Sequence, residues 1–82
     1  MRLELYQEVS LLHDVPEARL RQGDVAVLVD YVSHPRDGEE GAVLEVFNAV
    51  GESIAVVTVP ASFVAVLGRD QIPAVRALSL AA

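Results

Sequence analysis

Cysteine, lysine and tryptophan are missing from this sequence of 82 residues. The absence of cysteine excludes disulfides, thiol catalysis and cysteine-ligated zinc, and it is typical of a protein from a reducing compartment. No run approaches the roughly 20 apolar residues of a membrane span. Arg2, Glu4 and Glu8 interrupt the apolar residues of the first ten positions, so we expect neither a signal segment nor membrane binding, and a cytoplasmic location.

The charge is strongly of one sign. Twelve acidic residues stand against six arginines, which gives a formal net charge of −6. Such a surface repels phosphate backbones. A nucleic-acid-binding small barrel would need Arg19, Arg21 and Arg69 to converge in the fold, and we expect a protein partner instead.

The length supports one domain, covering residues 1–82, because a second hydrophobic core would need roughly 50 more residues. Hydrophobic residues make up 52% of the chain, and fifteen of them are valine, a residue typical of strands. A domain of this size cannot enclose all of these side chains. We therefore expect apolar residues on the surface, as an interface for a partner or for a homo-oligomer.

Short strands separated by turn residues are the main pattern along the chain. The predicted strands are residues 8–13, 24–32, 42–47, 53–59 and 63–67. In residues 24–32, strict alternation predicts that Val25, Val27, Val29 and Tyr31 share one face, with Ala26, Leu28, Asp30 and Val32 on the other.

The connections complete a predicted architecture. Residues 33–41 form a charged loop, Gly51 suits a positive φ in a hairpin loop, and Pro60 ends a strand. Ile72, Val75 and Leu78 are spaced by three, which fits a short helix capped by Asp70 that Pro73 weakens. The predicted fold is all-β, a small five-stranded SH3-like barrel with a short C-terminal helical or extended tail.

Several short segments carry a likeness to known sequences: residues 15–17, Leu20, and residues 23–25, 44–49, 51–60 and 69–78. These segments resemble a bacterial domain-of-unknown-function family, number four-nine-two-six. The likeness covers nearly the whole chain, and the central hairpin is its most specific part. Ala26 departs from the family, which commonly has glycine there. The resemblance implies a short bacterial protein with a small barrel, no established activity, and a partner encoded by a neighbouring gene.

Nothing in the chain matches a catalytic, cofactor or metal motif. The serines lie outside Gly-x-Ser-x-Gly elbows, and His13 and His34 sit at unrelated positions with too few companions for a metal site. We therefore expect no enzyme, no cofactor and no metal.

A non-catalytic protein-interaction module is the leading hypothesis for function. An antitoxin or immunity-like inhibitor of a basic enzyme is the alternative, and a nucleic-acid-binding barrel is the second alternative. The predicted partner contacts gather in and beside the charged loop: Tyr31, His34, Arg36, Asp37, Glu39 and Glu40. Plain solubility is the competing explanation for this acidic loop.

Overall fold

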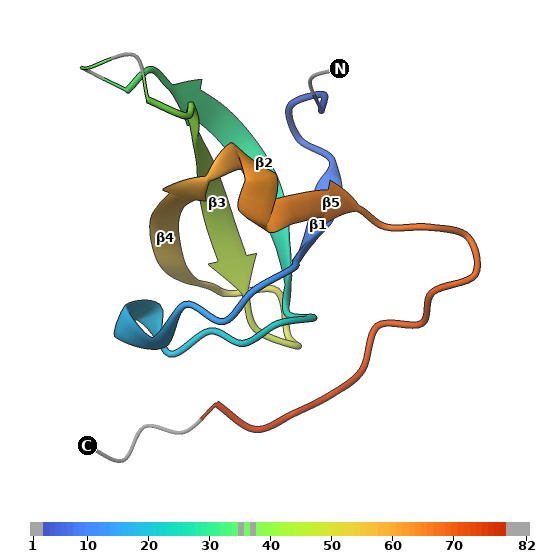
Figure 1. The fold of residues 1–82 in the computed structure, drawn as a ribbon. Coiled ribbons are helices and arrows are strands. Elements are labelled where there is room, and N and C mark those ends of the chain that lie inside the picture. Colours follow the sequence, from blue (N-terminus) through green and yellow to red (C-terminus); the bar gives the residue numbers. More distant parts are fainter. Residues whose placement is uncertain (1–2, 35, 37, 79–82) are drawn as a thin grey trace.

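Five strands form one open antiparallel sheet in a computed structural model that describes residues 3–34, 36 and 38–78 (Figure 1). The strands are β1 (Glu8–Leu11), β2 (Val25–Val32), β3 (Gly41–Phe47), β4 (Ser53–Pro60) and β5 (Val64–Val66). Their order across the sheet is β4-β3-β2-β1-β5, so β4 and β5 are the two ends and do not pair. The prediction of an all-β fold with five strands is confirmed. The predicted closure into a barrel is not found, because the two end strands do not pair with each other.

Two short 3-10 helices lie in the connections. The first, η1 (Pro16–Ala18), follows β1, and the second, η2 (Ala61–Phe63), joins β4 to β5. β4 ends at Pro60, as predicted, because proline has no N–H to donate to a further ladder bond. Within the described residues no helix is long and apolar enough to cross a membrane.

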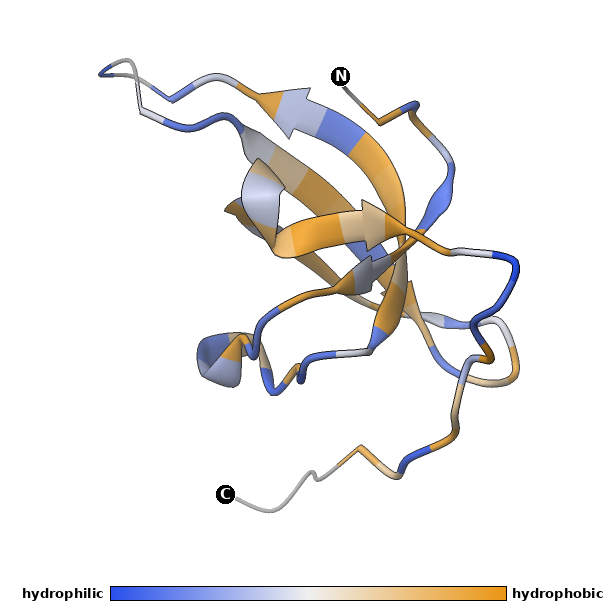
Figure 2. Cartoon of the chain, turned by 45° about the vertical axis from the view of Figure 1, so that its right-hand side comes forward, coloured by the Kyte–Doolittle hydropathy of each residue, from blue (hydrophilic) through white to orange (hydrophobic). Residues whose placement is uncertain are grey.

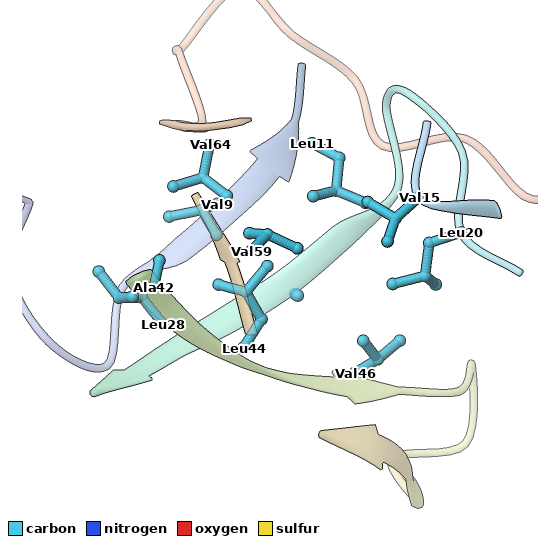
Figure 3. Close-up of a cluster of buried hydrophobic side chains, with 11 residues drawn as sticks. Val9, Leu11, Val15, Leu20, Leu28, Ala42, Leu44, Val46, Val59 and Val64 are labelled. Carbon is cyan, nitrogen blue, oxygen red and sulfur yellow. The ribbon is translucent and has the colours of Figure 1, made fainter. Parts of the chain in front are cut away.

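The core lies on the concave face of the bent sheet (Figure 3). Its largest fully buried side chains are Leu28, Leu44 and Val9, which come from β2, β3 and β1. Further buried residues come from both end strands and from the η1 segment, where Val15 and Leu20 pair in an isolated bridge. Valine and alanine supply seven of the eleven buried core residues, and leucine supplies the other four.

A β-bulge changes which residues of β2 face the core. Leu28 pairs with Leu44, but the next pair is Asp30 with Val43, so the register shifts at Val29. Beyond the bulge Tyr31 packs against the core and Asp30 is exposed. The prediction that Tyr31 shares the face of Val27 and Val29 is therefore wrong, because one inserted residue reverses every later side chain.

The β3–β4 hairpin follows the prediction. Gly51 has φ +84°, the conformation that favours glycine. Asn48 organises the loop: its Oδ1 accepts the N–H groups of Val50 at 3.1 Å and Glu52 at 2.9 Å, and its Nδ2 donates to Glu52 Oε1 at 2.7 Å. This closed loop joins β3 to β4, whose pairing register shifts between Val46 and Phe47 next to the loop.

The segment after β5 is extended and not helical. Residues 72–78 have no regular secondary structure, so the predicted short helix is wrong and the extended form of the tail is found. Pro73 explains the difference, because its ring disfavours the helical conformation at Ile72 and it has no N–H for a helical bond. The segment leaves the sheet and returns beneath it (Figure 1).

Candidate interaction surface

The outward face of the sheet carries carboxylates interleaved with valines. Strand register aligns these side chains into two cross-strand rows, with Glu8, Val27, Glu45 and Val56 in the first and Asp30, Val43 and Thr58 in the second. Neither row contains a basic residue. Ser53 Oγ donates to Glu45 Oε2 at 2.6 Å, which orients that carboxylate. We call these seven residues the outer rows.

Strand β4 leaves one side of this face open. It is an end strand of eight residues, and no other strand of the described chain pairs with its outer edge. Its outward side chains are also uncovered, since Val56 is 62% exposed and Ile54 is exposed beside Phe47. A long end strand with exposed apolar residues offers both backbone hydrogen bonds and contact area to another chain.

A groove of about 490 Å³ lies between the sheet and the C-terminal segment. Val27, Phe47 and Ile54 line its sheet side, while Val75 and Arg76 line the opposite side. Its walls are more apolar than polar, with Asp24 and Glu8 as the acidic groups. The groove continues from the first of the outer rows, because Glu8 and Val27 belong to both.

Asp24 and Arg76, which both line the groove, form an ion pair. Arg76 Nε donates to Asp24 Oδ1 at 2.8 Å, its Nη2 donates to Asp24 Oδ2, and Nη2 also donates to the Arg19 carbonyl at 3.1 Å. The guanidinium hydrogen bond lowers the pKa of Asp24, partial burial opposes this shift, and the Arg21 N–H bond adds to it. The same contact raises the pKa of Arg76.

The sequence-predicted contact residues lie in different environments. The Tyr31 phenol donates to the Leu3 carbonyl at 2.9 Å from a half-buried position, so its ring faces inward. His34 and Arg36 are exposed, and the Arg36 N–H donates to His34 Nδ1 at 3.1 Å.

The acidic end of the predicted loop is attached to η2. Glu39 accepts the Ser62 N–H at 2.7 Å and the Ser62 hydroxyl at 3.0 Å, and the Glu40 carbonyl accepts the Ala61 N–H at 2.9 Å. Glu39 therefore has a structural role at this connection. Asp37 lies outside the described residues.

The two histidines show no metal-binding arrangement. His13 packs on Phe63 with ring centroids 4.7 Å apart, and Phe63 itself packs against the core. No group of three histidine, aspartate or glutamate side chains that could hold a metal ion occurs within residues 3–34, 36 and 38–78.

Comparisons of the chain with models of protein families, with curated proteins and with solved structures find no match. The resemblance to family four-nine-two-six stays a prediction.

Two features of this surface could not be predicted from the sequence pattern: the Asp24–Arg76 ion pair and the outer rows. The ion pair joins residues 52 positions apart, and neither Asp24 nor Arg76 has a local motif that indicates the other. The outer rows depend on the bulge at Val29, which alternation does not reveal. The exposed valines, in contrast, were expected from composition.

Proposed function

We propose that this protein is a non-catalytic protein-interaction module on an SH3-like fold. The strand order β4-β3-β2-β1-β5, with a 3-10 turn between β4 and β5, supports the fold assignment. The proposed contact surface consists of the outer rows and the free edge of β4. The observation that carries the proposal is the alternation of carboxylates with valines, half-buried at Val27 and Val43 and exposed at Val56, beside the free edge of an end strand.

The partner that fits this surface is an extended protein segment with basic and apolar residues in alternation. Pairing along the free edge of β4 would supply backbone hydrogen bonds, and alternate side chains would lie beside Val56 and Thr58, the members of the outer rows on β4. Glu45 lies on β3, two strand spacings or about 10 Å from the added segment, within reach of a long basic side chain. Its charge steers association, and the more distant Glu8 and Asp30 add to the negative field of the same face. An inhibitor of a basic enzyme is the narrower form of this proposal, supported by the net charge of −6.

Two matched substitutions test the surface. Val56→Lys places a cation and a long side chain in the first outer row, and Val50→Lys makes the same change in the hairpin loop, where Val50 is 80% exposed. Neither site is buried, so both variants are expected to fold. The probe is a ten-residue peptide of alternating arginine and valine, with binding followed by fluorescence anisotropy.

The unmodified protein and Val50→Lys should bind the peptide alike, with affinity falling as salt increases, and Val56→Lys should lose at least tenfold in affinity. A peptide in which glutamate replaces arginine should not bind. Equal binding of the arginine peptide by both variants would exclude the outer rows as the contact surface. Tagged forms of the same proteins, used on a lysate of the native host, then identify the natural partner by its absence from the Val56→Lys sample.

A further inference from the structure

The C-terminal segment, residues 67–78, is attached to the sheet by very few polar contacts. A turn in which the Gln71 N–H donates to the Gly68 carbonyl at 3.1 Å follows β5. Among the described residues beyond that turn, Arg76 forms the side-chain hydrogen bonds to the rest of the chain. They are accepted by the Asp24 carboxylate and the Arg19 carbonyl. The segment is thus an extended arm with one anchor.

The anchor itself is specific. A guanidinium and a carboxylate meet through two nitrogen–oxygen contacts, a geometry that the planar fork of arginine favours and that lysine cannot reproduce. The Arg21 N–H donates to Asp24 Oδ2 at 2.8 Å and so orients the receiving carboxylate. Asp24 is therefore a positioned receptor for one arginine on an extended segment.

The rest of the arm is poorly covered in a single chain. Ile72 is 90% exposed and Val75 is 95% exposed, although both are apolar, and Figure 2 shows apolar residues along this segment outside the sheet. The groove of about 490 Å³ also separates the arm from the sheet. Exposed apolar side chains beside an apolar groove are typical of a surface that another chain covers.

We propose that residues 67–78 are exchanged between two copies of this chain, with Arg76 of each copy bound to Asp24 of the other. Exchange reproduces the same contacts in the dimer, so its gain is the new apolar surface that the second copy buries around Ile72 and Val75. The ten residues from 67 to 76 reach about 30 Å when extended, enough to cross to a neighbouring copy. This dimer is independent of the partner proposed above.

Opposite charge reversals provide a test that only exchange can satisfy. Asp24→Arg and Arg76→Asp each place like charges at the anchor, so each variant alone should be monomeric by light scattering. In their equimolar mixture, Arg76 of the first variant meets Asp24 of the second, and the reversed pair forms at the other site. The mixture should therefore show about twice the mass of one 8.8 kDa chain.

Three controls accompany the mixture. The double variant, which carries both reversals in one chain, should dimerise like the unmodified protein. Arg69→Asp and Asp70→Arg change the same charges in the same segment away from the anchor, and both should leave the dimer intact. A mixture that stays monomeric, an unmodified protein that is monomeric at all concentrations, or single variants that remain dimers would each overturn the proposal.

A second measurement avoids any dependence on the folding of the reversed variants. Isotope-labelled and unlabelled copies of the unmodified protein are mixed after unfolding and refolding, and NMR detects contacts between unlike copies. Contacts from the Arg76 side-chain protons to the Asp24 Hβ protons, which the ion pair brings together, should pass between a labelled and an unlabelled chain. Their occurrence within one chain only would overturn the proposal.

Discussion

Gly41 has no side chain, which leaves room on the outer face for the side chains of Val32 and Thr58 to lie close to β3. A Cβ at this position would lie 2.8 Å from Val32 Cγ2 and 2.9 Å from Thr58 Cγ2, against about 3.5–4.0 Å for relaxed carbon contacts. Val32 and Thr58 are β-branched and cannot turn easily about χ1. Gly41→Ala therefore forces both strands or both side chains to shift.

The expected cost follows from two opposing contributions. Overpacking of this kind destabilises a fold by about 1–3 kcal/mol. Alanine also lowers the conformational entropy of the unfolded chain, which stabilises the folded state by about 0.4–1 kcal/mol. The net loss is roughly 1–2 kcal/mol. Because each kcal/mol shifts the midpoint by about 4–8 °C in a domain of this size, Gly41→Ala should melt roughly 5–15 °C lower.

Far-UV circular dichroism during thermal and urea unfolding measures this change. Thr58→Ser removes one of the two methyl groups and Val32→Ala removes the other, so the cost of Gly41→Ala should fall by at least about 0.5 kcal/mol in either background. An unchanged cost in both backgrounds would show that contact with these methyl groups is not the cause. A melting temperature of Gly41→Ala equal to that of the unmodified protein would refute the steric argument altogether.

Two further predictions concern the carboxylates with assigned partners. The pKa of Asp24 is lower in the folded chain than in the unfolded chain, so its contribution to the free energy of unfolding is present above about pH 4 and is lost as pH falls through the folded value. Arg76→Ala should make the free energy of unfolding less dependent on pH in the acid range, and it should raise the Asp24 pKa measured by NMR titration. An unchanged Asp24 pKa would contradict the conclusion that the Arg76 hydrogen bond lowers it. Glu39→Ala should cost about 0.5–1.5 kcal/mol and speed hydrogen exchange at the Ser62 amide, because that amide loses its acceptor. Glu17→Ala, an exposed control on η1, should change neither quantity, and a stable, protected Ser62 amide in Glu39→Ala would argue against the structural role of Glu39.

Local patterns predicted most of the strands because the signals are short-range. Alternating valines indicate β2, and a glycine able to adopt positive φ indicates the loop before β4. Pro60 is also a local signal, because proline has no backbone N–H to donate to a neighbouring strand, and β4 ends there. The predicted strand at residues 8–13 is two residues too long, since β1 ends at Leu11. Neither Leu12 nor His13 has a local feature that indicates where the partner strands end.

Side-chain direction was predicted only up to the first irregularity. Alternation assigns Val25, Val27 and Leu28 correctly, but it fails at Tyr31, which the bulge turns toward the core. The inserted residue is accommodated by the pairing of β2 with β3, and its energy depends on both strands. A single strand sequence does not contain that information.

The sequence by itself determined the chemistry available to this protein: an acidic, valine-rich chain without cysteine, whose strands and turns follow from backbone preferences at single residues. Only the tertiary structure decided which of these residues meet. The alignment of the outer rows depends on the registers of four strands. The Asp24–Arg76 ion pair depends on the fold bringing together two residues that are 52 positions apart in the sequence. Contacts of this kind arise because burial of the core determines how the strands are arranged, and that arrangement determines which surface groups lie together.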